Sequence, residues 1–286
     1  MTPAAAAGAG GVLYVVATPI GNLADVTLRA LDVLRDVPLI AAEDTRLTRR
    51  LLDRHGITGR TTSFHARSPS TRLDALLEHL RGGQDLALVT DAGTPGVSDP
   101  GADLVAAWAA AGGRVVPVPG ASAVLAAVAA TGVAGPRWAF EGFLPRSGRE
   151  RRERLAAMAA DRRGIVIFEA PSRVAATLRD LVAACGEERP GAVARELTKM
   201  HEQIVRGTLG ELATAVSDGS IPSRGEFVLV VGMGEARERS REDVVATALA
   251  AVDRLVGEGV ARGEAARRVA AETGVPRRRL YRPVDV

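Results

Sequence analysis

The sequence predicts an α/β protein with two α/β domains and a small helical piece after them. Short apolar runs alternate with stretches that carry apolar residues at helical spacing, and this alternation predicts strands and helices in turn. A break rich in glycine and proline interrupts the alternation at 131–137, and the strand pattern stops near residue 235. We therefore predict a disordered tail at 1–11, α/β domains at 12–135 and 136–234, and a helical module at 240–286.

The first domain is predicted to contain a mostly parallel sheet. Its strands are expected at 12–17, 39–42, 61–64, 85–90 and 114–118, and its helices at 27–36, 45–54, 71–81, 103–111 and 122–130. Leu28, Leu31 and Leu34 show the helical spacing well. Because strands and helices alternate strictly, helices should cover both faces of the sheet.

The second domain is predicted to contain a mixed sheet. An apolar stretch at 138–144 leads into a helix rich in arginine and glutamate at 149–160. Further strands are expected at 165–168, 192–196, 203–206 and 226–231, and further helices at 172–185 and 209–216. Some of these strands follow one another without a helix between them, which parallel pairing does not allow.

The composition excludes several classes of protein. Of the 286 residues, 47% are hydrophobic and 25% charged, which excludes a chain that is disordered throughout. The single cysteine, Cys185, excludes an internal disulfide and a cysteine-rich metal cluster and suits a reducing cytoplasm. The sequence contains no run of about 18 apolar residues, so it predicts no membrane span. The Ala/Gly-rich start is not typical of a signal peptide. We expect no metal site and a cytoplasmic location.

Nearly all basic residues are arginines, because Lys199 is the only lysine among 37 basic side chains. Arginine forks suit phosphates, although a bias in the coding DNA explains the same composition. In the C-terminal module, a small-residue helix, a turn at Gly274 and a second basic helix are typical of a helix-turn-helix. We interpret 240–286 as an RNA-contact module, with a packing or dimerisation tail as the alternative.

The usual nucleotide-binding motifs are missing, and four unusual loops take their place. No Gly-x-Gly-x-x-Gly follows the first strand, and no Walker sequence occurs. The loops at 18–22, 42–46, 91–101 and 119–122 all follow strands. Since the carboxyl ends of parallel strands meet at one sheet edge, these loops predict a ligand site there.

The same loops carry a family resemblance. Seven motifs occur in order, at 16–27, 42–46, 91–101, 119–123, 142–145, 168–173 and 195–199. With them the chain resembles the ribosomal RNA small subunit methyltransferase I family of the tetrapyrrole methylase superfamily, over roughly residues 12–232.

The resemblance implies a two-domain tetrapyrrole-methylase fold, a homodimer and S-adenosylmethionine as the cofactor in the cleft between the domains. It implies 2′-O-methylation of the ribose of a decoding-centre cytidine in 16S rRNA, with the small ribosomal subunit as partner. The cofactor residues that it implies are Pro19, Gly93, Thr94, Val97, Ser98, Ser122, Ala123, Phe168, Glu169, Leu197, Thr198, Gly225 and Glu226.

A ribose hydroxyl is a weak acid, so a base or a nearby charge should help the methyl transfer. The catalytic candidates are Glu43, Asp44, His65 and Lys199. The alternatives stay open: Asp44 caps the following helix and pairs with Arg46, His65 packs at the surface, and Lys199 pairs with Glu202.

Four arginines are candidates for binding the RNA substrate: Arg46, Arg146, Arg149 and Arg173. The stretch 146–154 suits RNA phosphates, and an ordinary solvated helix is the alternative. Phe64, Trp138 and Phe143 are candidates for stacking a base, although core positions are the commoner place for such side chains. The rival functions are a tetrapyrrole methyltransferase of the same superfamily and an RNA-binding protein without activity.

Overall fold

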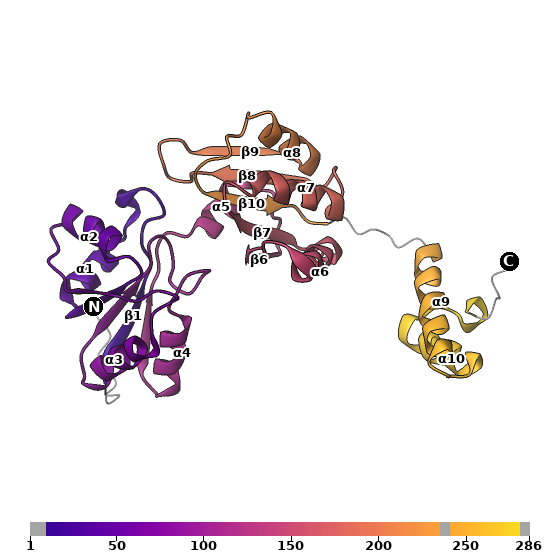
Figure 1. The fold of residues 1–286 in the computed structure, drawn as a ribbon, viewed down its shortest axis with the longest axis horizontal. Coiled ribbons are helices and arrows are strands. Elements are labelled where there is room, and N and C mark those ends of the chain that lie inside the picture. Colours follow the sequence, from indigo (N-terminus) through magenta and orange to yellow (C-terminus); the bar gives the residue numbers. More distant parts are fainter. Residues whose placement is uncertain (1–9, 235–240, 281–286) are drawn as a thin grey trace. The chain divides into compact units, whose positions relative to one another are not determined.

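A computed structural model describes residues 10–234 and 241–280 (Figure 1). The chain forms two compact units, Met1–Met233 and Gly234–Val286. The first unit contains two five-stranded sheets, and the second contains a pair of helices. Most of the predicted tail at 1–11 lies outside the described residues.

The first sheet is parallel throughout, as its strictly alternating sequence predicts. Its strands are β1 (Val12–Val16), β2 (Leu39–Ala42), β3 (Thr61–Ser63), β4 (Leu86–Val89) and β5 (Arg114–Val118). They lie in the order β3-β2-β4-β1-β5. The carboxyl ends of all five strands therefore meet at one edge, where the loops at 18–22, 42–46, 91–101 and 119–122 begin.

Helices cover both faces of this sheet (Figure 1). They are α1 (Leu28–Asp36) and α2 (Thr45–Arg54) on one face, and α3 (Ser70–Arg81) and α4 (Ala102–Ala110) on the other. Leu34 and Leu52 are fully buried on the first face, and Leu80 and Trp108 are buried on the second. A short 3₁₀ helix, η1 (Leu23–Asp25), precedes α1.

The second sheet is mixed, also as predicted. Its strands are β6 (Trp138–Phe143), β7 (Gly164–Glu169), β8 (Pro190–Arg195), β9 (Gln203–Thr208) and β10 (Phe227–Val231), in the order β6-β7-β10-β8-β9. Only β6 and β7 pair in parallel; the other neighbours are antiparallel. The direct return from β8 to β9 explains the missing helix between them.

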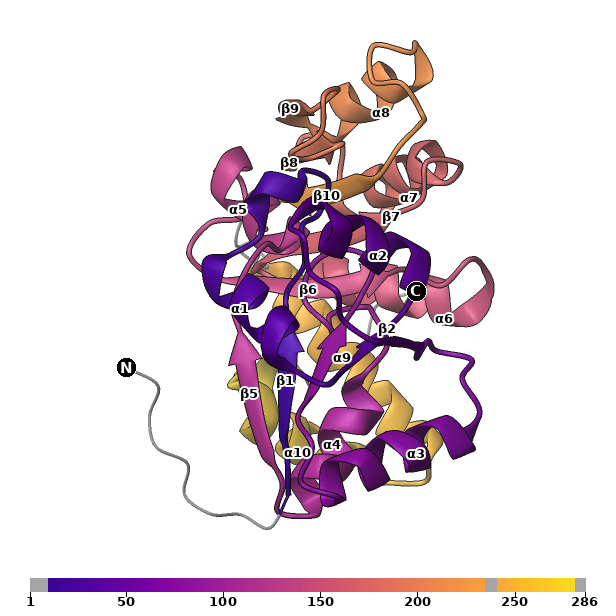
Figure 2. The ribbon, with the colours of Figure 1, turned by 90° about the vertical axis from the view of Figure 1, so that its left-hand side faces the viewer.

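The helix α5 (Ala123–Thr131) joins the two sheets into one unit. It follows β5 of the first sheet, yet its buried residues Val124 and Ala127 pack against Val166 and Val230 of the second. The opposite face of the second sheet is covered by α6 (Gly148–Ala160), α7 (Val174–Cys185) and α8 (Leu209–Ser217). The strand-end edge of the first sheet thereby lies toward the second sheet (Figure 2).

The second unit consists of α9 (Arg241–Gly257), α10 (Arg262–Thr273) and the 3₁₀ helix η2 (Arg277–Arg279). Val252, Val269 and Leu280 form its core. Where the sequence predicts a second basic helix, the described residues form only η2. Gly274 ends α10 at φ +70°, and Pro276 cannot donate a backbone hydrogen bond. None of the helices within the described ranges is long and apolar enough to cross a membrane.

Candidate active site

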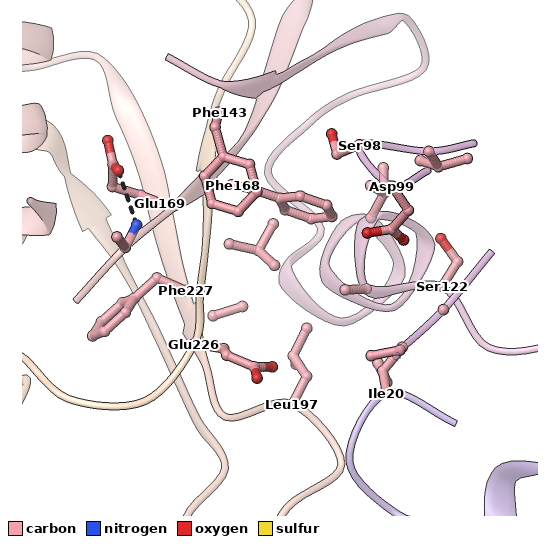
Figure 3. Close-up of a pocket in the computed structure, with 18 of the residues that line it drawn as sticks. Ile20, Ser98, Asp99, Ser122, Phe143, Phe168, Glu169, Leu197, Glu226 and Phe227 are labelled. Carbon is pink, nitrogen blue, oxygen red and sulfur yellow. Dashed lines mark hydrogen bonds between the residues drawn. The ribbon is translucent and has the colours of Figure 1, made fainter. Parts of the chain in front are cut away.

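The strand-end loops of the first sheet and the second sheet enclose a cavity of about 360 Å³ (Figure 3). This volume suits a ligand of cofactor size. Asp99 and Ser122 lie on one side of the cavity, and Phe168 and Leu197 lie on the other. Most of the lining is apolar, so a few polar groups must orient what binds there.

The loop 91–101 forms one wall, and its backbone is held in unusual conformations. Gly93 and Gly101 have φ values of +86° and +117°, and Ser98 has a φ of +65°. Thr18 holds the loop through two backbone hydrogen bonds. Its N–H donates to the Gly93 carbonyl (2.8 Å), and its carbonyl accepts from the Gly93 N–H (3.0 Å). The loops after β1 and β4 are therefore joined to each other at the cavity.

The aromatic wall comes from the second sheet. The Phe168 ring lies 4.8 Å from Phe140 and 5.6 Å from Phe143, measured between centroids. Phe143 lines the cavity and is 55% exposed, and the pairing of β6 with β7 shifts register between Phe140 and Gly142. A Cβ on Gly142 would lie 2.9 Å from Ser98 Oγ, so glycine lets this strand approach the loop 91–101 closely.

The loop after β8 contributes Leu197 and carries backbone strain. Glu196 and Thr198 have φ values of +52° and +65°, which residues other than glycine seldom adopt. Across from them, Gly225 has a φ of +88°, and a Cβ there would lie 2.5 Å from Glu196 Oε1. Thr198 Oγ1 is buried without a hydrogen-bond partner. Strain and an unpaired hydroxyl in one loop are typical of a ligand site.

Eleven of the thirteen cofactor residues expected from the resemblance line the cavity. Those from the first half are Gly93, Thr94, Val97, Ser98, Ser122 and Ala123. Those from the second half are Phe168, Glu169, Leu197, Gly225 and Glu226. Pro19 and Thr198 lie next to lining residues and do not line the cavity themselves.

None of the four catalytic candidates lines the cavity. Asp44 caps α2 by accepting from the Arg46 N–H (2.8 Å), and its ion pair with Arg46 (2.6 Å) lowers the pKa of Asp44 to about 2. Glu43 accepts from the Asp91 N–H (3.3 Å), and burial raises the pKa of Glu43. His65 is exposed and accepts from the Arg67 N–H.

Lys199 is held between two carboxylates and not by Glu202. Its Nζ lies 2.9 Å from Glu196 Oε1 and 3.1 Å from Glu226 Oε2. Burial favours the neutral amine, but the hydrogen bonds to both carboxylates raise the pKa of Lys199. Glu202 accepts instead from the Thr198 N–H at 2.7 Å. The catalytic roles of Lys199, Asp44, Glu43 and His65 stay predictions.

The candidate RNA-binding arginines differ in their surroundings. Arg146 is exposed, Arg149 pairs with Glu153 at the surface, and Arg46 is an exposed partner of Asp44. Arg173 donates to the Leu144 carbonyl at 2.7 Å, so it holds the turn that follows Phe143.

Arg151, from the basic stretch 146–154, is only 8% exposed. It donates to Asp180, Thr177 and the Pro145 carbonyl. Thr177 in turn donates to Glu169 at 2.5 Å. The predicted phosphate-tracking role does not fit Arg151, because this buried network fixes the turn at Pro145 instead.

Sequence reasoning missed one charged side chain that lines the cavity, Asp99. Its carboxylate points into the space between Phe168 and Ser122 (Figure 3). Burial and the charges of Glu43 and Asp91 raise the pKa of Asp99 to about 6, although a hydrogen bond with the Thr90 hydroxyl lowers this pKa in part. Its place in the glycine-rich loop was the available signal, but the charge of Glu43 comes from the end of another strand, β2, far away in the sequence.

The cavity fits a sulfonium cofactor that carries an adenine ring. Phe168 and Leu197 offer apolar surface for a flat base. The hydroxyls of Thr94 and Ser122 offer hydrogen bonds. Within residues 10–234 and 241–280, no group of three or more His, Cys, Asp or Glu side chains is placed to hold a metal ion.

Comparison with known proteins defines the class. Residues 12–213 match the family Tetrapyrrole (Corrin/Porphyrin) Methylases. The structure of a cobalt precorrin-4 methyltransferase aligns with a TM-score of 0.60 at 20% identity, covering 77% of this chain and 94% of that one. The uroporphyrin-III C-methyltransferase of Thermus thermophilus, complexed with S-adenyl homocysteine, aligns with a TM-score of 0.56 at 19% identity, covering 78% and 97%. Fold and family together define an S-adenosylmethionine-dependent methyltransferase.

Relatives with higher sequence identity identify the family within this class. The chain is 47% identical over 273 residues to the ribosomal RNA small subunit methyltransferase I of Synechocystis sp., covering 95% of this chain and 96% of the relative. The proteins of the same name from Escherichia coli O157:H7 and Bacillus subtilis are 44% and 39% identical, each over 95% of this chain and over 94% and 93% of theirs. The chain therefore belongs to the ribosomal RNA small subunit methyltransferase I family of the tetrapyrrole methylases, which confirms the resemblance.

Proposed function

We propose that this protein methylates the 2′-hydroxyl of a decoding-centre cytidine ribose in 16S rRNA, with S-adenosylmethionine as the methyl donor. The observation that carries the proposal is the match to rRNA methyltransferase I relatives at 39–47% identity over 95% of the chain. The rival tetrapyrrole substrate is supported by the broad family match and by solved structures at about 20% identity, and the more similar rRNA methyltransferase I relatives outweigh both. The protein would act in the cytoplasm as a homodimer on the small ribosomal subunit.

In this proposal the cavity residues bind the cofactor, whose sulfonium supplies an electrophilic methyl group. The loop 91–101 and Phe168 orient it and exclude water. Because the methyl group is already activated, the protein contributes mainly alignment, which is worth up to about 7–11 kcal/mol in favourable cases. Phe143 and Val97, 55% and 37% exposed, form the part of the lining that a nucleotide would meet first.

We assign RNA contact to the exposed arginines near that edge and in the second unit. Arg146 follows Phe143 by three residues and is exposed. Arg278 and Arg279 are exposed on η2. Such side chains suit phosphates by charge and by their planar fork.

The experiment is methyl transfer from labelled S-adenosylmethionine to small subunits that lack the modification, with tetrapyrrole precursors in parallel. Label mapped to a 16S ribose supports the proposal. Label in the tetrapyrrole alone contradicts it.

A further inference from the structure

We propose that Asp99 is the catalytic base, the group that accepts the proton of the attacking ribose hydroxyl. The inference rests on the proposed function and adds a residue that the sequence did not single out. Asp99 lies in the loop 91–101, lines the cavity and directs its carboxylate into it (Figure 3).

The other carboxylates of the cavity are already engaged. Three line it: Asp99, Glu169 and Glu226. Glu169 is 2% exposed and accepts from the Ala170 N–H (2.9 Å) and the Thr177 hydroxyl (2.5 Å), so both of its oxygens are occupied. Glu226 pairs with Lys199 at 3.1 Å. Asp99 forms no ion pair with any residue in the described ranges.

The hydroxyls of the lining are weaker bases than a carboxylate, and those of Ser122 and Thr94 make structural contacts. Ser122 Oγ accepts from the Leu125 N–H at 3.4 Å at the start of α5, and Thr94 Oγ1 donates to the Ala121 carbonyl at 3.4 Å. An aspartate that faces an apolar wall is therefore the group best suited to receive a proton in this cavity.

The surroundings of Asp99 favour this role. The pKa of Asp99 is raised by burial, by the charge of Glu43 after β2 and by the charge of Asp91 after β4. A hydrogen bond with the Thr90 hydroxyl lowers it. No arginine or lysine is among these groups. A base whose pKa is about 6 is ionised at neutral pH and still accepts a proton more readily than an ordinary aspartate.

The ribose oxygen forms a bond to the methyl carbon of the sulfonium donor, and the carbon–sulfur bond breaks with its electron pair remaining on sulfur. The hydroxyl proton passes to the Asp99 carboxylate and then to water. The products are a 2′-O-methyl ribose, the thioether of the donor and a released proton.

The first test compares wild type with Asp99→Asn and the conservative Asp99→Glu on small subunits at saturating donor. We expect Asp99→Asn to lower the single-turnover rate roughly 10²–10⁴-fold, and Asp99→Glu to recover part of it. Affinity for S-adenosylhomocysteine, measured by calorimetry without RNA, should change less than about threefold. A rate within threefold of wild type, or a loss of affinity as large as the loss of rate, overturns the proposal.

The second test uses pH and needs no activity for its main readout. Carbon-13 NMR of aspartate carboxyls in the free protein should show a group titrating near pH 6 that disappears in Asp99→Asn. The wild-type rate should rise through the same pH, and Glu43→Gln should move both midpoints lower because it removes a charge that raises the pKa of Asp99. A rate profile unchanged in Glu43→Gln while the NMR midpoint moves overturns the base role.

The outcomes separate this inference from the proposed function. If wild type transfers no methyl group to 16S rRNA, the proposed function fails. If wild type is active and the Asp99 variants behave as wild type, only the inference fails.

Discussion

Gly21 and Lys199 are in direct contact although they lie in different halves of the first unit. A Cβ built on Gly21 would lie 2.5 Å from Lys199 Cγ and 2.9 Å from Thr198 Oγ1. The loop after β1 therefore packs against the strained loop after β8, beside the cavity residues Ile20 and Leu197. The absence of a side chain at Gly21 lets the two halves close around the site.

Gly21→Ala should separate these loops. We expect a loss of about 1–3 kcal/mol in the free energy of unfolding, the usual cost of overpacking, together with weaker binding of S-adenosylhomocysteine. Urea unfolding and calorimetry measure the two effects. Gly82→Ala is the matched control, because its Cβ would meet the nearest atoms at 3.4 Å. Equal behaviour of the two variants would contradict the close-packing argument.

Lys199→Gln should destabilise the protein in a pH-dependent way. Lys199 lowers the pKa of Glu196, so the pair stabilises the fold above the ordinary pKa of a glutamate and loses this effect as pH falls through the lowered value. We expect a loss of about 1 kcal/mol at pH 7, because the pair is partly exposed, and almost none once the pH lies below the lowered pKa of Glu196.

The control for Lys199→Gln is Arg35→Gln, which breaks an exposed pair with Asp32 and should have little effect. Melting temperatures across pH measure both. If Lys199→Gln instead lowers methyl transfer more than about 100-fold with little change in stability, Lys199 has the catalytic role that its sequence position predicts.

The fold was predictable because its signals are local. The apolar spacing within 45–54 and the short apolar run at 39–42 were enough to predict α2 and β2 with the bounds that the structure has. The glycine-rich loop at 91–101 likewise predicted a ligand site after β4, since tight turns there leave backbone exposed.

The charged groups of the site were less predictable because burial depends on distant partners. The pKa of Asp99 is raised by burial, by the charge of Glu43, which the end of β2 brings near, and by the charge of Asp91 in its own loop. Arg151 looked like part of a basic surface, but Asp180 and Thr177 hold it inside. A signal did exist for Arg151, since it shares a helix face with the buried Leu155 and Met158.

Phe168→Ala should weaken cofactor binding. Phe168 forms part of the apolar wall of the cavity, and removing most of its surface should cost about 1–2 kcal/mol, or roughly tenfold in Kd for S-adenosylhomocysteine. Phe140→Leu is the control, because Phe140 contacts the Phe168 ring but does not line the cavity. Calorimetry measures both, and an unchanged Kd in Phe168→Ala would place the cofactor elsewhere.

Arg278→Gln with Arg279→Gln should weaken binding to the small subunit without affecting the cofactor. Each arginine that contacts a phosphate steepens the salt dependence, so the slope of log Kd against log salt should fall by about 1–2. Arg262→Gln, which breaks a pair with Asp253 at 3.0 Å, is the control. A slope that does not change in the double variant would favour a packing role for the second unit.

Asp99→Asn should stabilise the protein at neutral pH and not in acid. A carboxyl whose pKa is raised to about 6 on folding destabilises the fold progressively as pH rises from about 4 to 6, because the folded state resists the charge. The variant lacks this penalty. Since Asp99 is only half-buried, solvent reduces the gain to about 1 kcal/mol, or 2–4 °C in Tm for a unit of this size.

Scanning calorimetry at pH 7.5 and pH 4 measures this gain, with Asp74→Asn on the exposed face of α3 as the control. A gain of similar size at both pH values would mean that Asp99→Asn stabilises by packing, and the penalty on the charged carboxylate would be refuted. A gain confined to pH 7.5 means that the fold maintains an unfavourable charge in the cavity, as expected where stability is given up for activity.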